Sequence, residues 1–334
     1  MPTTETHDTT VFVIKRNGDR VPLDITKIKD VIAWACKGKK VQPVELEAKF
    51  ALRLTDGIAT RDIQESIIEC AASMANIEAP DWRYVAGRLK MWGIWKDTLV
   101  SREASQYFNG NFNGQLDPYY ASSAKIPFSE IVKKKVKAGI YDPRILIYSP
   151  QSLDIAYQWI RKEWDEDYDY AGSLHLANRY LQKDELPQEA FLLCALLIAS
   201  PEMNPEYHLE ESPVAIHSAV MQRAKQYYEA IASRKISLAT PLLSHLRTAR
   251  KQSLTSCFIT AADDSLDSIM HEADNLSRIS KGGGGAGINI SRIRGVGSWV
   301  MGTAKASKGI PSWLPIFNAI ALAVNQGKQV CPVF

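Results

Sequence analysis

The chain has 334 residues, of which 46% are hydrophobic and 23% charged, and its formal net charge is +3 at pH 7. This length allows two or three domains, each with its own core. The nearly neutral charge argues against nucleic-acid binding. No apolar run approaches the ~20 residues of a membrane span, and the polar N-terminus has no secretion signal.

Five cysteines are scattered along the chain, at positions 36, 70, 194, 257 and 331, without CxxC or Cys/His spacing. This pattern argues against structural zinc and against a disulfide scaffold, and it favours a reducing compartment. We therefore expect a cytoplasmic protein with no metal site of its own, no membrane segment and no nucleic-acid partner.

The first hundred residues predict a β-hairpin followed by four helices. Asn-Gly at 17–18 separates the short apolar runs VFVIK and RVPL, as is typical of a hairpin. Apolar residues at helical spacing then cover 25–36, 44–55, 60–75 and 80–101. Thr60 is expected to cap the third helix, with Gln64 near the position of a capping-box partner. We expect a first domain over residues 1–101.

A loop-forming sequence, NGNFNGQLDP at 109–118, precedes a region that reads as mostly helical to about residue 234. Its basic run KKKVK at 133–137 fits a solvated helix face better than a polyanion site. After residue 236, short apolar runs alternate with helical patterns, as in an α/β barrel. We expect a helical region over 102–235 and the start of the barrel over 236–334.

Several polar residues of the first domain form a candidate nucleotide site. Cations neutralise phosphates, and amides at a helix N-terminus point at anions. A nucleotide triphosphate could therefore be surrounded by Lys15, Arg16, Lys27, Thr60 and Lys96. The alternative is ordinary surface charge on a small domain.

The glycine cluster GGGGAG at 282–287 is no Walker loop, because Gly-Lys-Ser/Thr does not follow it. Four consecutive glycines cost backbone entropy on folding, which favours a function that needs bare backbone, such as the approach of a phosphate or sugar. A flexible loop or close helix packing is the alternative.

Around this cluster lie further candidates. Asp264 suits a ribose hydroxyl or a base amine, and Ser265 fits a helix N-cap. Arg294 and Lys305 are among the cations of a glycine-studded stretch, which is either a mobile effector loop or an ordinary solvated one. Cys257 by itself is most simply a buried structural thiol, because redox catalysis needs a partner thiol that nothing here identifies.

Taken together, these segments resemble the large (α) subunit of class I ribonucleotide reductase. VIKRNGDRVPLDITKI, DGIATRDIQESII and APDWRYVAGRLKMW resemble its regulatory ATP cone. SLATPLLSHLRT, SLTSCFITAADDSLDSI, GGAGINISRIRGVGS and AVNQG resemble the start of its ten-stranded catalytic barrel. The resemblance covers 11–327 and implies an α/β fold: an ATP cone of a hairpin and four helices, a helical segment, and the first half of the barrel.

The resemblance also implies roles for single residues. Cys257 matches the cysteine that forms a redox pair with a second cysteine deep in the barrel, reduces the ribose 2′ position and becomes a disulfide. The matches to substrate-holding positions are Thr240, Ser256 and Gly285, together with Cys257. The matches to the cone positions that contact ATP or dATP are Lys15, Arg16, Lys27, Thr60 and Lys96.

A specificity-effector site at the dimer interface is implied for Asp264, Ser265 and Arg294. Its first loop corresponds to 295–307, and its second opens at 325–327 with Gln326. Met301 stands where the family has a cationic arm, so Lys305 is expected to substitute for it.

The implied function is the reduction of ribonucleoside diphosphates to 2′-deoxyribonucleotides by thiyl-radical chemistry. ATP/dATP and dNTP effectors, accompanied by Mg²⁺, would control it. The implied partners are a radical-generating β subunit that carries the metal centre, a second α subunit, and thioredoxin or glutaredoxin as reductant.

The sequence after Gly327 departs from the family's Gly-Gly-Lys/Arg-Arg, and the radical cysteine and the second redox cysteine are absent. We therefore expect the N-terminal part of a split α subunit, completed by a C-terminal partner chain. The alternative is a catalytically inactive nucleotide-binding regulator of a full-length reductase. A truncated, non-functional product is less consistent with the intact motifs.

Overall fold

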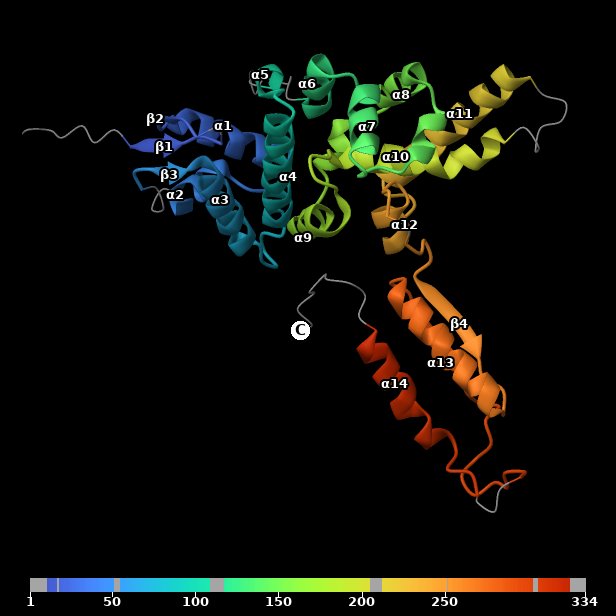
Figure 1. The fold of residues 1–334 in the computed structure, drawn as a ribbon. Helices are drawn as coiled ribbons and strands as arrows, with labels where there is room; N and C mark the ends of the chain where they lie inside the picture. The colour runs from blue at the N-terminus through green and yellow to red at the C-terminus, as the bar shows by residue number, and fades with distance from the viewer. Residues whose placement is uncertain are drawn as a thin grey trace, which may run out of the picture. The chain divides into compact units, whose positions relative to one another are not determined.

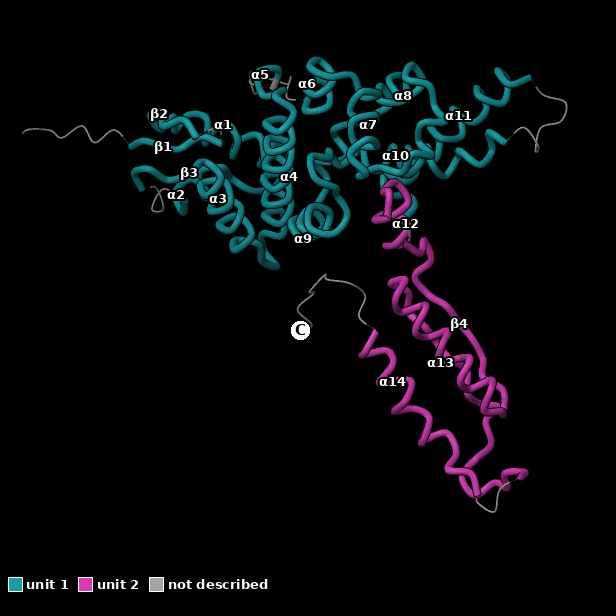
Figure 2. The backbone as a smooth tube through the Cα atoms, viewed as in Figure 1, with its two compact units in different colours: residues 1–237 teal, residues 238–334 magenta. Residues whose placement is uncertain are grey.

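The computed structural model describes residues 11–16, 18–50, 55–108, 117–204, 212–250, 252–302 and 306–324. The chain divides into two compact units, unit 1 over 1–237 and unit 2 over 238–334 (Figures 1 and 2). Within the described ranges, no helix is both long and apolar enough to cross a membrane.

Unit 1 begins with a three-stranded sheet in the order β2 (Arg20–Pro22), β1 (Phe12–Ile14), β3 (Ile58–Ala59). The pairing of β1 with β2 is antiparallel, which confirms the predicted hairpin, whereas β1 and β3 are parallel. β3 has no counterpart among the predicted elements, because two residues are too few to show the alternation by which a strand is recognised.

Four helices follow: α1 (Ile25–Cys36), α2 (Pro43–Phe50), α3 (Thr60–Met74) and α4 (Trp82–Ser101). They confirm the four predicted helices. The predicted cap of α3 is wrong, since Ala59 occupies the N-cap position without a side-chain bond and Thr60 is already helical. Strand β3 holds Ala59 extended directly before the helix. Gln64 is buried and donates its amide to the Leu89 carbonyl at 2.7 Å, so it joins α3 to α4 instead of closing a capping box.

The rest of unit 1 is helical, as predicted. Its α-helices are α5 (Ser105–Phe108), α6 (Pro118–Lys125), α7 (Phe128–Lys137), α8 (Pro150–Tyr157), α9 (Tyr170–His175), α10 (Pro187–Ala199) and α11 (Pro213–Ala232). Shorter turns lie between them: η2 (Pro143–Ile147), η3 (Lys162–Asp165), η4 (Leu176–Tyr180) and η5 (Ser200–Met203). Helix α10 is apolar around nearly its whole circumference because neighbouring helices bury it (Figure 1).

Helix α4 belongs to the packing of both the cone and the helical region. A side chain at Gly87 would place its Cβ 2.1 Å from the Tyr168 carbonyl oxygen, so only glycine allows α4 to approach the backbone before α9 this closely. Further along α4, the Trp95 indole donates to the buried Asp165 carboxylate at 3.0 Å. The cone's last helix is therefore tied to the helical region along much of its length.

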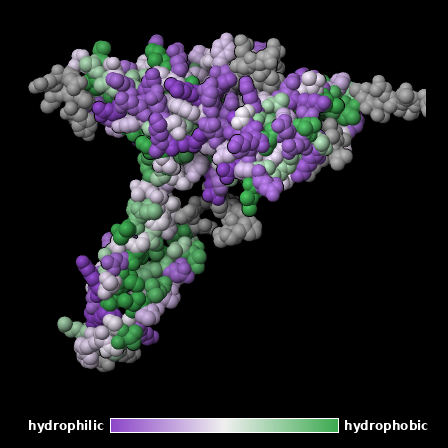
Figure 3. All heavy atoms as spheres, turned by 180° about the vertical axis from the view of Figure 1, so that it is seen from behind, coloured by the Kyte–Doolittle hydropathy of each residue, from purple (hydrophilic) through white to green (hydrophobic). Residues whose placement is uncertain are grey.

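Unit 2 contains α12 (Thr240–His245), β4 (Cys257–Ala261), α13 (Leu266–Lys281), β5 (Gly285–Asn289), η7 (Ile310–Ser312) and α14 (Leu314–Ala323). Strands β4 and β5 pair in parallel through the α13 crossover, which confirms the predicted alternation of strands and helices. A small core fills the space around α13, formed by Ala262, Ile269, Ala273, Leu276, Ile293 and Phe317. Many hydrophobic side chains nevertheless remain at the surface of this unit (Figure 3).

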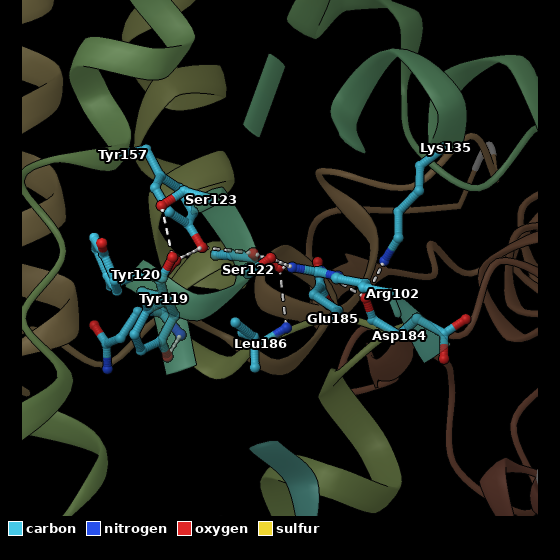
Figure 4. Close-up of polar contacts among 12 residues, drawn as sticks. Arg102, Tyr119, Tyr120, Ser122, Ser123, Lys135, Tyr157, Asp184, Glu185 and Leu186 are labelled. Atoms are coloured by element: carbon cyan, nitrogen blue, oxygen red, sulfur yellow. Dashed lines mark hydrogen bonds and ion pairs between the residues drawn. The ribbon is translucent and has the colours of Figure 1, made fainter. Parts of the chain in front are cut away.

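Unit 1 also contains a buried polar network centred on Arg102, the residue after α4 (Figure 4). Its guanidinium donates to both Glu189 carboxylate oxygens at 2.7 Å, to the Ser122 hydroxyl at 2.7 Å and to the Asp184 carbonyl at 2.7 Å. Both charged side chains are almost completely shielded, with 6% of Arg102 and 0% of Glu189 exposed. A buried ion pair of this kind is stable only because the opposite charge and the hydrogen bonds together offset the cost of removing both groups from water.

Lys135 lies at the edge of this network and corrects the expectation of a solvated basic face on α7. It is buried, and its ammonium donates to the carbonyls of Lys183 at 2.9 Å and Asp184 at 2.8 Å (Figure 4). A run of lysines normally predicts a solvated helix face. The sequence alone does not show that one lysine of this run, Lys135, faces backbone carbonyl oxygens of another segment.

Candidate functional sites

The two parallel strands of unit 2 present one covered face and one open face. Side chains alternate between faces along a strand, so Phe258 and Ile288 turn towards the core around α13 while Cys257, Ile259 and Gly285 lie on the exposed face. Ile259 is 89% exposed. Parallel sheets are normally covered on both faces. The exposed face of β4 and β5 therefore resembles a buried sheet face from which the covering layer is missing.

The glycines of the cluster differ in what surrounds them, and the approach of a phosphate or sugar to them remains a prediction. A Cβ at Gly284 would lie 2.6 Å from the Phe258 ring, and Gly283 has a φ of +82°, so these two glycines allow a tight turn and close packing. At Gly285 the nearest atom to such a Cβ is 3.6 Å away. Gly285 therefore leaves bare backbone on the open face, where a ligand can approach.

Cys257 occupies the first position of β4, opposite Gly285 in the strand register. Its thiol is exposed and lies 3.5 Å from the Ser256 hydroxyl. The expectation of a buried structural thiol is therefore wrong for Cys257, because the alternation of β4 puts it on the uncovered face. Thr240, the first residue of α12, is exposed in the same unit.

Thiol labelling of the native chain is expected to modify Cys257 first. Among the described residues Cys36, Cys70 and Cys194 are buried, so a reagent reaches them slowly, and burial also raises the pKa of the Cys36 thiol to about 11. Peptide mapping after a short pulse of iodoacetamide at pH 8 measures this, with Cys331 followed as a separate peptide. The fast phase should vanish in Cys257→Ser, and equally fast labelling at Cys36 would contradict the exposure pattern.

Asp264, Ser265 and Arg294 are brought together at the start of α13. The Arg294 side chain donates to the Asp264 carboxylate at 2.8 Å and its backbone amide donates at 3.1 Å, and these bonds lower the pKa of Asp264. Ser265 caps α13 by accepting from the Ser268 amide, as predicted. The Arg294 guanidinium also donates to the Trp299 carbonyl at 2.7 Å.

The carboxylate and the cap therefore lie beside a loop that Arg294 holds, and their role in binding an effector remains a prediction. Met301, at the position of the family's cationic arm, is exposed. Lys305 and Gln326, which the sequence assigns to the same site, lie outside the described residues.

In the cone, the predicted cations converge on Lys96 of α4. Burial, together with the nearby positive charges of Arg16, Lys27 and Lys15, lowers the pKa of the Lys96 ammonium to about 8. The ammonium also lies 5.1 Å from the centre of the Trp92 ring. Four cations, one of them partly desolvated, therefore give this part of the cone a positive potential, and their role in binding a nucleotide remains a prediction. Thr60 lies at the start of α3, at the edge of the cone's sheet.

Two residues of this site were not predicted. The Asp97 carboxylate accepts from Arg16 at 2.7 Å and from Arg61 at 3.2 Å. Each directly follows a predicted site residue in the chain: Asp97 follows Lys96, and Arg61 follows Thr60. This adjacency is the feature of the sequence by which the two residues could have been found. Sequence alone does not show that α3 and α4 turn them towards the same turn after β1.

Comparison with known proteins finds three family matches along the chain. Residues 11–97 match the family described as the ATP cone domain, 166–251 match the all-alpha domain of ribonucleotide reductase, and 255–330 match its barrel domain. The chain is 49% identical over 319 residues to the ribonucleoside-diphosphate reductase subunit alpha of Synechocystis sp., covering 96% of this chain and 37% of that protein.

Two further relatives are more distant. The corresponding subunit of Helicobacter pylori is 30% identical over 325 residues, which is 95% of this chain and 36% of that protein. Subunit alpha of ribonucleoside-diphosphate reductase 1 from Escherichia coli is 29% identical over 323 residues, with 95% and 38% covered. The chain thus spans less than two fifths of the length of these relatives. It carries an ATP cone domain, the all-alpha domain of ribonucleotide reductase and part of the barrel domain of that enzyme.

Proposed function

We propose that this chain supplies the nucleotide-sensing part and one wall of the substrate site of a ribonucleoside-diphosphate reductase α subunit. The observation that carries the proposal is the position of Cys257, exposed opposite Gly285 on the uncovered face of β4 and β5. A reactive thiol beside bare backbone suits a nucleotide whose ribose must approach a sulfur atom. An inactive regulator would have no need of that arrangement.

In this role Cys257 is one of two thiols that reduce the ribose. The 2′-hydroxyl leaves as water, a C–H bond replaces the C–O bond at C2′, and the two thiols lose two hydrogen atoms and form a disulfide. The second thiol belongs to the remainder of the barrel. A radical from a β subunit starts the reaction, and thioredoxin or glutaredoxin reduces the disulfide afterwards.

The uncovered face of β4 and β5 supports completion of the barrel by further α-subunit sequence. Exposed Ile259 and the open edge of the sheet need partner strands. In the proposed arrangement a second polypeptide provides them. Mass spectrometry of what co-purifies with this chain from its native host tests the arrangement: a separate polypeptide with the rest of the barrel supports it. A native chain much heavier than 37.3 kDa, or reduction by this chain alone, contradicts it.

The cone's cation cluster supports binding of ATP or dATP through the triphosphate. Lys15 and Arg16 follow β1, Lys27 lies on α1 and Lys96 on α4, so separate elements bring positive charge to one place. The Lys96 ammonium itself lies 5.1 Å from the centre of the ring of the buried Trp92. Calorimetric titration with ATP and dATP tests this part of the proposal, and Lys96→Gln should weaken binding of both.

The affinity of the cone for ATP is expected to fall as the pH rises above about 8. In the free chain the pKa of Lys96 is about 8, so this ammonium loses its proton from there upwards. Bound triphosphate favours the charged form and raises that pKa, so binding takes up a proton, and the affinity drops by up to about tenfold per pH unit. Phosphates, with a second pKa of about 6, are already ionised in this range.

Calorimetry between pH 7.5 and 9.5, in buffers of different ionisation enthalpy, measures both the affinity and the proton uptake. Lys96→Met should abolish the pH dependence. Lys90→Met is the matched control, because Lys90 lies on the same helix but pairs with Glu65 at 2.9 Å. A pH profile that is the same in wild type and Lys96→Met would show that another group is responsible.

A further inference from the structure

We propose that Asp97 is an internal counter-anion of the cone, which neutralises Arg16 and Arg61 while no nucleotide is bound and competes with the incoming phosphates for them. This inference rests on the proposed nucleotide site. It adds a residue that sets the affinity of the site from within the chain.

The geometry places Asp97 at the meeting point of three elements. Arg16 lies in the turn after β1, Arg61 in the first turn of α3, and Asp97 near the end of α4. The Arg16 Nε atom lies 2.7 Å from Asp97 Oδ1, and an Arg61 terminal nitrogen lies 3.2 Å from the same oxygen. One carboxylate oxygen thus serves two guanidinium groups from elements that are far apart in sequence.

The environment makes the Arg16 contact stronger than an ordinary surface pair. Only 13% of the Arg16 side chain is exposed, whereas Asp97 is 44% exposed. A half-shielded ion pair is screened less by water and salt than an exposed one. By contrast, the nearby pair of Lys27 with Asp24 is longer, at 3.6 Å, and both of its side chains are largely exposed. Asp97 is therefore the carboxylate best placed to offset the cation cluster.

Phosphate and carboxylate compete for the same donors. Guanidinium groups bind both anions through charge-assisted N–H bonds of the same kind. A triphosphate that reaches Arg16 therefore meets a cation whose charge is already compensated, and it also meets the negative charge of Asp97. Removal of that charge leaves Arg16 and Arg61 to the ligand.

Release of Asp97 carries its own cost. Asp97 lines a small pocket, and Asp184 and Glu185 line the same pocket. A carboxylate that moves there meets like charge instead of its two arginines. Both effects lower the affinity of the native cone for polyphosphate.

The test compares wild type with Asp97→Asn in the full chain, as its native assembly, by calorimetric titration with ATP. The asparagine keeps the shape of the side chain and removes its charge. We expect ATP to bind roughly three- to thirtyfold more tightly, as for the loss of one charge-assisted contact that opposes binding. Without ATP, the variant should unfold at a lower temperature than wild type, because the cation cluster has lost its counter-charge.

Glu65→Gln is the matched control. It removes one negative charge from an ion pair of the same domain, that with Lys90, but away from the cation cluster. It should leave ATP affinity nearly unchanged. Equal or weaker binding by Asp97→Asn, with wild type binding normally, would overturn the inference, because the carboxylate would then orient Arg16 for the ligand. Absence of binding by both chains would overturn the proposed nucleotide site and this inference with it.

Discussion

Replacement of Cys257 by serine in the assembled reductase is expected to abolish multiple turnover while nucleotide binding stays intact. Serine has nearly the same shape and keeps the polar contact to Ser256, but its hydroxyl cannot form the disulfide that takes up the oxidation. Because Cys257 is exposed on a strand face that none of the described elements covers, its loss removes no contact with the described core. Deoxyribonucleotide formed per α subunit, in the presence of excess reductant, is the measurement, and ATP binding is followed in parallel.

Ala261→Ser is the control for this experiment. Ala261 lies on the same strand and the same exposed face as Cys257, so the substitution introduces an equal hydroxyl without removing a thiol. Turnover should persist in that variant. Repeated turnover in Cys257→Ser would show that a different thiol carries the reduction. Loss of ATP binding in the same variant would assign Cys257 a structural role.

The second large effect is expected for Arg102→Met, which should lower the free energy of unfolding by about 3–5 kcal/mol. The substitution leaves the Glu189 carboxylate, with 0% of its side chain exposed, without its bidentate partner. It also removes the donors to the Ser122 hydroxyl and the Asp184 carbonyl. Burial by itself would lower the pKa of Arg102, but Glu189 more than offsets this and raises it, so the pair is charged in the native chain.

Urea unfolding of the full chain, followed by tryptophan fluorescence, measures this loss. Arg234→Met provides the comparison, since Arg234 pairs with Asp167 at 3.1 Å and both side chains are partly exposed, at 38% and 54%. Such surface pairs contribute about 0–1 kcal/mol. An equally small loss for Arg102→Met would mean that water reaches Glu189 when the arginine is removed.

The helices with a regular repeat of apolar residues, and the hairpin, could be predicted from the sequence. Helices α1, α3 and α4 repeat their apolar residues over at least three turns, and the hairpin carries its own turn signal, so neighbouring residues contain the information. Strand β3 and the true cap of α3 were not predictable in this way. Both depend on the pairing of residue 58 with Val13, which is distant in sequence. The domain boundaries and the roles of the effector residues stay predictions.

At the two candidate sites, the sequence identified the residues by their chemical type but did not identify the side chains that they contact. The cations of the cone and the cysteine of β4 stand out by type and motif. That Cys257 is exposed follows only from the side of β4 that α13 covers, and that Arg16 meets Asp97 follows only from the position of α4 beside the turn after β1.

The sequence by itself thus determined the helices, the hairpin and the motifs that resemble ribonucleotide reductase, because these depend on residues close together in the chain. The tertiary structure alone decided which charges are compensated and which faces remain open. Ion pairing and burial depend on distances of a few ångströms between segments tens of residues apart, and local patterns do not specify those distances. Asp97 and Lys135 show this most directly, because each is paired with groups on other elements that its own stretch of sequence does not identify.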